Sequence, residues 1–450
     1  MLNEYSGSPY DVLILGGGLA GLSAGVTAIE SGLRPVILEA AKQPGGRAKS
    51  FYDPSFAETL DCGPHLLIGA YSATLKLLDI IGTRDLLLES PTVNYQFWSR
   101  KLGWHSLNCP NLPAPLHLLV GVLRYAPLTL KDKLAALSLG IAFLPSQASL
   151  ENKSVTQWLH GHGQKGGIFE QLWAPLCLAA LNEPAGSANA ALFAEVMKLS
   201  FFKSRTAARP LLPTVPLTKL IGEPAKAYIK AKGGEVLTGQ RVKKITFNGE
   251  KVIGVTTGMN NFSQPPGVIS ALPYGPLSTL LPDWAKKSGF SQLSSTPIVS
   301  VHLLYDKKSQ MPAPLVGLPF ETSQWLFDRG ISQQNKNSEG QARLSGVMSG
   351  AYRESQWSKK RLITTVAEDI ERLQPQLKES NIVGARVIKE RRATFSPWPQ
   401  TSHLRPDVGT PWKNMVIAGD WTAGNLPATL EGATLSGERA ARKILAFFCY

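Results

Sequence analysis

Residues 12–21 read VLILGGGLAG, and this stretch decides the fold. The apolar run Val12–Leu15 is typical of a buried strand, and a helical pattern follows from residue 20 to residue 31 and ends at Gly32. The turn between them, Gly16-Gly17-Gly18-Leu19-Ala20-Gly21, contains G-x-G-x-x-G. A strand, this turn and a helix in succession predict a dinucleotide-binding βαβ unit.

Each glycine of the turn has a separate task. Gly16 allows the sharp turn, Gly18 lets a pyrophosphate approach the backbone, and Gly21 lets the helix pack closely on the strand. The first helical residues, Leu19 and Ala20, lie where backbone amides meet the phosphate charge. We therefore expect all five residues to line the cofactor.

A second strand, Pro35–Glu39, ends on an acidic residue at the distance typical of this unit. A carboxylate about 20 residues after the turn bonds a ribose hydroxyl. Glu39 therefore becomes a candidate ligand of the ribose, and Ala40, which follows it, a neighbour of the cofactor.

Length and composition indicate a folded protein of more than one domain. The chain has 450 residues, of which 43% are hydrophobic, and ten are Trp. Lys and Arg outnumber Asp and Glu by 47 to 33, which gives a formal net charge of +14. The basic residues are scattered and no nucleic-acid-binding motif is present. We expect anionic ligands or an anionic membrane surface, and no nucleic acid.

Cysteines and apolar runs bear on the location of the protein. The four cysteines form no CxxC pair and show no metal-ligand spacing, so we expect free thiols in a reducing cytoplasm and no metal. Acidic Glu4 and Asp11 precede the first apolar run, which is unlike a signal peptide. The longest apolar candidate, residues 134–144, is about half the roughly 20 residues of a membrane-spanning helix.

The rest of the chain alternates between helical and strand-rich segments. Residues 154–203 are helical and unusually apolar, and Asn248-Gly249 predicts a hairpin between strands at 242–247 and 251–256. We predict further elements in this order: strands at 297–304 and 343–350, a helix at about 357–379, a strand at 415–418 and a helix at 426–448.

Dinucleotide signals at both ends of the chain, with helical matter between them, predict a discontinuous cofactor domain. We expect an α/β fold with a doubly wound, Rossmann-like domain and an inserted α+β substrate domain. The predicted cofactor domain comprises residues 1–100, 215–290 and 390–450, and the predicted substrate domain comprises residues 101–214 and 291–389.

Three more segments identify the cofactor. Gly45-Gly46-Arg47 follows Glu39 closely, Val242 ends a stretch that begins at Gly233-Gly234, and residues 418–433 read AGDWTAGNLPATLEGA. In this order they resemble the motifs of the flavin amine oxidase and phytoene desaturase superfamily. The resemblance implies FAD.

The resemblance also implies roles for these residues. Gly46 would lie along the FAD diphosphate and ribityl chain, with Arg47 near the flavin. Val242 falls where a strand of the superfamily bonds the adenine through its backbone. Asp420, preceded by Gly419, would bond the ribityl or phosphate region.

The C-terminal helix would complete the site. Pro427, Ala428 and Thr429 stand at its start, where its amides would point at the flavin pyrimidine. The positive end of the helix dipole favours the negative charge of a reduced flavin.

A narrower resemblance concerns hydroxysqualene dehydroxylases. Residues 60–71, LDCGPHLLIGAY, are similar to their D-x-G-x-H-L-L-x-G-x-Y run, and residues 173–182, WAPLCLAALN, resemble their substrate-domain signature. Residues 392–395, RATF, fit as well. The resemblance implies an FAD-dependent oxidoreductase that reductively removes the hydroxyl of hydroxysqualene to give squalene, on the route to hopanoids.

Pro64 departs from the dehydroxylase pattern and keeps other functions open. G-P-H is common in carotenoid desaturases, which run the flavin in the oxidative direction. A flavin amine oxidase is a second alternative, and a lipid escort that keeps the fold without redox chemistry is a third. No motif identifies the electron donor or the oligomeric state.

His65 has two interpretations. A histidine that directly precedes an apolar run, here residues 66–68, is commonly a core residue. In the superfamily, however, this loop passes near the flavin, where His65 could donate a proton to the departing hydroxyl.

The implied isoprenoid substrate favours contact with a membrane. The net charge of +14 and the proline-punctuated apolar stretch 111–148 suit an anionic surface. We predict a cytoplasmic protein that associates peripherally with the inner face of the membrane.

Overall fold

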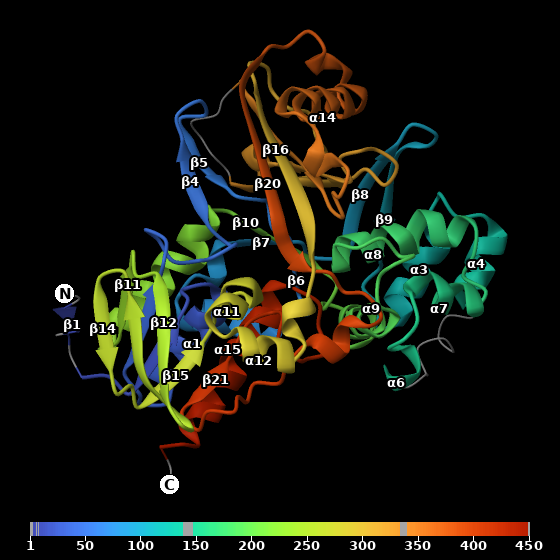
Figure 1. Cartoon of the computed structure of the whole chain (residues 1–450). Coiled ribbons are helices and arrows are strands. Elements are labelled where there is room, and N and C mark those ends of the chain that lie inside the picture. Colours follow the sequence, from blue (N-terminus) through green and yellow to red (C-terminus); the bar gives the residue numbers. More distant parts are fainter. Residues whose placement is uncertain (1–2, 6, 8, 138–146, 334–339, 449–450) are drawn as a thin grey trace.

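The computed structural model describes residues 3–5, 7, 9–137, 147–333 and 340–448. Figure 1 shows a compact α/β region around the chain termini, a tall sheet above it, and a helical region beside that sheet. Residues 138–146 lie outside the described part, so the apolar stretch 134–144 and the longer stretch 111–148 are described only in part. Cys449 also lies outside it.

The α/β region is built on a parallel sheet whose order among the described strands is β11-β3-β2-β15-β21. The strands are β11 (Glu235–Thr238), β3 (Pro35–Glu39), β2 (Val12–Leu15), β15 (Gly267–Ser270) and β21 (Met415–Ile417). Because the sheet takes strands from three distant parts of the chain, the predicted discontinuous Rossmann-like fold is confirmed. The positions of its boundaries with the second domain stay a prediction.

Helices α1 (Leu19–Glu30) and α15 (Leu430–Leu445) pack tightly together in this region. A Cβ added to Gly437 of α15 would lie only 2.2 Å from the carbonyl oxygen of Ala20. The two cofactor motifs at opposite ends of the sequence are therefore joined through their own helices. Other helices of this region are α2 (Ser72–Ile80), α10 (Glu223–Ala231), α11 (Tyr274–Leu280) and α12 (Pro282–Lys287).

Smaller sheets extend this region. One contains the predicted hairpin, with strands β1 (Asn3–Glu4), β14 (Asn260–Ser263), β13 (Lys251–Thr257) and β12 (Val242–Asn248). Another contains β6 (Leu67–Ile68), β10 (Pro210–Pro213) and β7 (Leu87–Glu89). Strands β4 (Ser50–Asp53) and β5 (Glu58–Asp61) form a separate hairpin that leads into the loop of His65.

The tall sheet has the order β20-β16-β19-β18-β17-β8-β9 in the described chain. Its strands are β20 (Ile382–Phe395), β16 (Ser295–Tyr305), β19 (Ala342–Met348), β18 (Trp325–Asp328), β17 (Leu315–Gly317), β8 (Asn94–Ser99) and β9 (Gly103–Asn108). The long pair β16 and β20 reaches from the α/β region up to α14 (Lys359–Leu373), as Figure 1 shows. The lower end of β20 contains Ala393, which contacts Arg47 of the cofactor motifs.

The helical region fills the remaining side. It contains α3 (Leu116–Arg124), α4 (Leu130–Leu137), α6 (Gln147–Leu150), α7 (Val155–Gly161), α8 (Ala174–Leu181) and α9 (Ala190–Met197), with π-helical turns η2 (Phe169–Trp173) and η3 (Lys198–Phe202). Trp158, Trp173 and Phe193 are buried in its core. Among the described residues, no helix is both long enough and apolar enough to cross a bilayer.

Two helices are shorter than the sequence indicated. α15 begins at Leu430 and not at residue 426, because Thr429 is its N-cap and accepts a hydrogen bond from the amide of Gly432. α14 ends at Leu373, before Pro375, which disfavours helical geometry in the residue that precedes it. The late start of α15 leaves Pro427 and Ala428 in the loop that approaches the cofactor motifs.

Candidate active site

The glycine turn after β2 presents backbone without side chains at the start of α1. A Cβ on Gly21 would lie 1.9 Å from the carbonyl oxygen of Gly16, so only glycine lets this helix lie so close to the turn. Gly18 is the N-cap and offers no side chain to the amides of the first turn, at Leu19 and Ala20. Those amides are therefore donors for a ligand.

The second glycine motif lies directly against the first. The amide of Gly45 donates to the carbonyl of Gly17 (2.8 Å), and Gly18 and Gly45 form an isolated parallel bridge. Gly46 adopts φ +61°, and a Cβ there would lie 3.0 Å from the Cα of Gly18. The two turns form one cradle of bare backbone that a side chain would obstruct.

Glu39 is fixed at the edge of this cradle. Its Oε2 accepts a hydrogen bond from the amide of Gly17 (2.8 Å) and its Oε1 accepts one from Ala41 (2.7 Å). Each carboxylate oxygen keeps a further lone pair, which suits a ribose hydroxyl. Ala40 is exposed beside it.

The segment before Val242 lies along the same edge. The amide of Gln240 donates to the carbonyl of Glu39 (2.8 Å), and that of Gly239 donates to Ala41 (3.0 Å). Val242 then opens β12, opposite Thr257. The structure thus places the residues just before Val242 against the strand end that carries the predicted ribose ligand.

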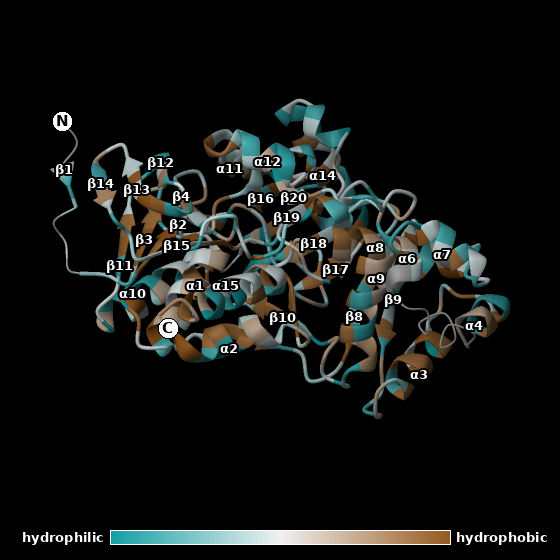
Figure 2. Ribbon diagram, turned by 60° about the horizontal axis from the view of Figure 1, so that its bottom comes forward, coloured by the Kyte–Doolittle hydropathy of each residue, from teal (hydrophilic) through white to brown (hydrophobic). Residues whose placement is uncertain are grey.

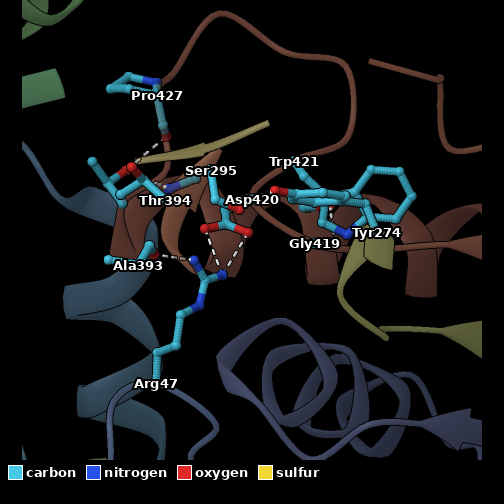
Figure 3. Close-up of polar contacts among 12 residues, drawn as sticks. Arg47, Tyr274, Ser295, Ala393, Thr394, Gly419, Asp420, Trp421 and Pro427 are labelled. Atoms are coloured by element: carbon cyan, nitrogen blue, oxygen red, sulfur yellow. Dashed lines mark hydrogen bonds and ion pairs between the residues drawn. The ribbon is translucent and has the colours of Figure 1, made fainter. Parts of the chain in front are cut away.

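Arg47 and Asp420 form the charged centre of the site (Figure 3). Nη2 of Arg47 lies 2.7 Å from both carboxylate oxygens of Asp420, and Nη1 donates to the carbonyl of Ala393. Asp420 is 7% exposed, whereas the Arg47 side chain is 44% exposed. The negative charge of Asp420 raises the pKa of Arg47 above its usual value, so Arg47 is a permanent cation.

The loop that carries Asp420 is tied down on both sides. The amide of Gly419 donates to Oγ of Ser436 in α15 (2.9 Å), and the hydroxyl of Thr422 donates back to the carbonyl of Gly419 (2.8 Å). Trp421 donates from Nε1 to the carbonyl of Leu272 (3.1 Å), in the loop that follows β15. The carboxylate therefore has little freedom to leave Arg47.

The start of α15 lies where the positive end of a helix dipole can act on a ligand. Pro427 is buried, and Ala428 and Thr429 follow at the helix N-terminus. Glu431 is the acidic residue of the first turn, but its carboxylate accepts hydrogen bonds from the amides of Ala73 (2.9 Å) and Thr74 (2.8 Å) at the start of α2. The carboxylate of Glu431 therefore caps the N-terminus of the neighbouring helix α2.

His65 is half-buried, with Nδ1 2.8 Å from the carbonyl oxygen of Gly63. A carbonyl only accepts, so Nδ1 carries the proton and a neutral His65 presents a lone pair at Nε2. Burial lowers the pKa of His65, the charge of Arg47 lowers it further, and Asp61 opposes both. The proton-donor role stays a prediction, and it requires the imidazolium form.

An apolar pocket of about 320 Å³ lies in the second domain. Its walls come from β8, α8, the loop after α8 and the β17–β18 hairpin, and they include Phe97, Leu178, Pro184, Phe320 and Trp325. This volume is within the range of small-molecule pockets, about 300–1,000 Å³.

A short path of contacts joins this pocket to Arg47. Asn182, two residues before Pro184 in the pocket wall, donates from Nδ2 to the hydroxyl of Thr394 (3.0 Å). Thr394 follows Ala393, whose carbonyl accepts from Arg47. The sequence indicated residues 173–182 and 392–395 as separate segments, and the structure brings them together.

The model of the flavin-containing amine oxidoreductase family matches residues 19–445. The chain belongs to this family. Flavin amine oxidoreductases carry out redox chemistry on a bound flavin, so the predictions of FAD and of an FAD-dependent oxidoreductase are confirmed.

Curated relatives of this flavin amine oxidoreductase match over nearly its full length. A hydroxysqualene dehydroxylase of Rhodopseudomonas palustris is 29% identical over 446 residues, which cover 97% of this chain and 98% of that protein. The Zymomonas mobilis enzyme of the same name is 28% identical, with coverage of 95% and 97%. A 15-cis-phytoene desaturase of Synechococcus elongatus is 23% identical, with coverage of 97% and 96%.

Solved structures share the fold. An oxidoreductase of Methanosarcina mazei superposes with a TM-score of 0.72 and 16% identity, covering 96% of this chain and 99% of that chain. Cyclohexylamine oxidase of Brevibacterium oxydans gives 0.70 and 16%, with coverage of 98% and 100%. These similarities confirm the predicted fold class.

The residues of the site fit a flavin dinucleotide. The bare glycine cradle and the free amides of α1 suit a diphosphate, Glu39 suits a ribose, and the start of α15 suits the electron-rich end of a flavin. The individual ligand assignments stay predictions.

Proposed function

We propose that the protein is an FAD-dependent dehydroxylase that converts hydroxysqualene to squalene, a step of isoprenoid biosynthesis that leads to hopanoids. The observation that carries the proposal is the similarity, over 97% of this chain, to a Rhodopseudomonas palustris protein of that name. The motifs at residues 60–71 and 173–182 and the apolar pocket beside Asn182 support it.

The chemistry suits the residues present. The hydroxyl is allylic, so its protonation and loss as water leave a delocalised cation. Bound reduced FAD supplies the hydride that quenches it. The apolar pocket holds a prenyl end of the substrate and excludes water, and the loop of His65 holds the proton for the departing oxygen.

A carotenoid desaturase is the second candidate. Pro64, which gives the G-P-H form, and the similarity to a 15-cis-phytoene desaturase favour it. A desaturase would use the same apolar pocket but would take hydride from a polyene precursor. The direction of hydride transfer therefore separates the two functions.

Contact with the membrane is part of the proposal. Large apolar side chains are exposed on β9, α3 and α4, and basic side chains accompany them. Helix α3 contacts both β9 and α4. Figure 2 shows α3 and α4 at the end of the molecule far from the N-terminus, with hydrophobic residues along α3. The exposed apolar side chains are Trp104 (42%), Leu116 (51%), Leu123 (38%), Leu130 (74%) and Leu134 (58%). With Arg124 and Lys131 also exposed here, this surface suits the headgroup region of an anionic bilayer.

Parallel incubations test the function. The protein reduced without oxygen is mixed with hydroxysqualene, and the oxidised protein is mixed separately with phytoene and with putrescine. We expect squalene from the first mixture and no product from the others. Desaturated carotenoid or an amine-derived aldehyde, without squalene, would replace the proposed function by one of the alternatives.

A further inference from the structure

Arg405 is a buried cation beside the C-terminal cofactor motif, and the proposed reaction gives it no role. It lies in the loop before β21 and is 7% exposed. Its Nη1 donates to the carbonyl of Gly424 (2.9 Å). Its Nη2 donates to the carbonyls of Thr422 (2.7 Å), Leu426 (3.1 Å) and, more weakly, Asp420 (3.3 Å). One side chain therefore holds four alternate carbonyls of the loop that leads from Asp420 to α15.

Arg405 is packed into the same unit as the charged centre of the site. Ala393, near the end of β20, accepts a hydrogen bond from Arg47. Phe395, the last residue of that strand, is 2% exposed, and its ring centre lies 4.6 Å from the guanidinium of Arg405. Asp420 meets both arginines, since its carboxylate binds Arg47 and its backbone carbonyl accepts from Arg405.

This arrangement leaves a surplus of positive charge. Both carboxylate oxygens of Asp420 bind Arg47 (2.7 Å), and none of the ion pairs between described residues includes Arg405. Asp420 is the one acidic residue between positions 418 and 429 of the sequence. Burial lowers the pKa of Arg405 to about 10, an effect that Asp420 opposes and Arg439 reinforces, so Arg405 is charged at neutral pH. Two buried or bonded arginines thus face a single carboxylate.

A charge of this kind is more than the binding of carbonyls requires. Neutral N–H donors bind carbonyls well, whereas a cation taken out of water carries a large desolvation cost. A fixed charge in a buried site stabilises opposite charge that develops beside it. In this family the developing charge is that of the reduced flavin, whose pyrimidine we expect at the start of α15. Leu426, which Arg405 binds, directly precedes Pro427 there.

We propose that Arg405 positions the loop of residues 420–426 against the flavin and that its charge stabilises the reduced flavin as an anion. The inference rests on bound FAD and not on the identity of the substrate. Two electrons and one proton convert oxidised FAD to this anion, and transfer of one hydride to the substrate restores the oxidised form. The charge of Arg405 acts in the same direction as the dipole of α15. An allylic cation is a strong hydride acceptor, so a flavin stabilised in this way still reduces it.

Two substitutions separate the charge of Arg405 from its hydrogen bonds. Arg405→Lys keeps the charge, but one ammonium group cannot reach all four carbonyls. Arg405→Gln keeps two N–H donors and removes the charge. Arg439→Gln is the matched control, because Arg439 is exposed and also donates to this loop, at the carbonyl of Ala423 (2.8 Å). Solvent and salt screen its charge.

The measurement is the midpoint potential of the bound flavin at pH 7, in protein saturated with FAD and without isoprenoid. Loss of the buried charge in Arg405→Gln should make reduction about tenfold less favourable, which lowers the potential of a two-electron couple by about 30 mV. Arg405→Lys and Arg439→Gln should stay near the wild type. FAD affinity should fall in both Arg405 variants, because both disturb the loop.

Two outcomes overturn the proposal. An unchanged potential in Arg405→Gln would mean that Arg405 only shapes the loop or serves the diphosphate. An equal fall of the potential in Arg405→Lys and Arg405→Gln would assign the effect to the shape of the loop and not to the charge.

The wild type keeps the proposal testable if the Arg405 variants do not fold. Arg47 and Arg405 stay charged between pH 6 and pH 8. Over this range the midpoint potential should change by about 30 mV per pH unit, the slope for one proton taken up with two electrons. A slope of about 60 mV per pH unit would indicate a neutral reduced flavin and contradict the proposal. Neither measurement uses hydroxysqualene, so a failure of the proposed substrate leaves both results valid.

Discussion

Glu39 is the residue at which the cofactor site can be tested by a single substitution. Glu39→Ala removes a charged acceptor for the ribose, worth roughly 1.5–3 kcal/mol, so FAD affinity should fall about tenfold to a hundredfold. Flavin occupancy across a dilution series measures this. Glu30→Ala, at the exposed end of α1, is the matched control. Equal flavin occupancy in both variants would show that Glu39 does not bind the cofactor.

His302 gives the protein a predictable response to acid. It is fully buried, its Nδ1 lies 2.7 Å from Oγ of Ser345, and burial lowers its pKa to about 3. The unfolded chain takes up a proton below about pH 6.5, whereas the folded protein does not until about pH 3. As the pH is lowered through this window, the free energy of unfolding should therefore decrease, by about 1.4 kcal/mol per pH unit from this group.

Denaturant unfolding at pH 7 and at pH 5 checks this expectation. His302→Asn should lose stability overall but show a flatter pH dependence than the wild type. The same substitution at the exposed His403 should leave the slope unchanged. A slope that survives in His302→Asn would mean that other groups cause it.

The surroundings of single residues were predictable from the sequence where one local motif fixes them, whereas their tasks as cofactor ligands stay predictions. Gly18, Gly46 and Glu39 are of this kind, because a turn or a strand end determines their surroundings. Asp61 and Glu431 stand in quoted motifs, but their partners Leu217 and Thr74 are distant in the sequence. No local pattern could have paired them.

At the scale of elements, Glu431 links α15 to α2. Glu431→Ala would leave the amides of Ala73 and Thr74 without their acceptor, at a cost of about 1–3 kcal/mol in the free energy of unfolding. Glu438→Ala in the same helix breaks only an i,i+4 ion pair with Arg442 and should cost about 0.5 kcal/mol or less. Urea unfolding compares them, and equal losses would contradict this role.

The surface of β9, α3 and α4 should bind anionic vesicles. Leu116→Ser with Leu130→Ser should weaken binding at least several-fold, because both side chains are exposed and apolar. Ile382→Ser with Val383→Ser, at an exposed site on β20, is the control. Sedimentation with neutral and anionic vesicles at low and high salt measures it. Equal, negligible binding of the wild type to both would contradict membrane contact.

Elements with a strong hydrophobic period were predictable, and β20 was not. The strands of the parallel sheet are short apolar runs between turn signals, which local sequence specifies. β20 spans 14 residues, many of them exposed and charged, because it lies at the edge of its sheet. Charged residues commonly protect such edges, and they conceal the strand pattern.

For the whole molecule, the order of the cofactor motifs was enough to predict a discontinuous FAD fold. The apolar pocket was not predictable, because its walls come from four separated segments around residues 97, 170–185, 317–325 and 349. Apolar residues of the helical region that face the pocket look the same in sequence as those of the core, such as Trp158. Only the packing of the second domain distinguishes them.

The central claim is that hydroxysqualene takes a hydride from this flavoprotein. The most direct measurement is an anaerobic titration of the fully reduced protein with hydroxysqualene, followed by flavin absorbance and by product analysis. We predict full reoxidation of the flavin with one equivalent of squalene formed per flavin. A flavin that stays reduced throughout the titration, in protein whose flavin oxygen still oxidises, would contradict the account.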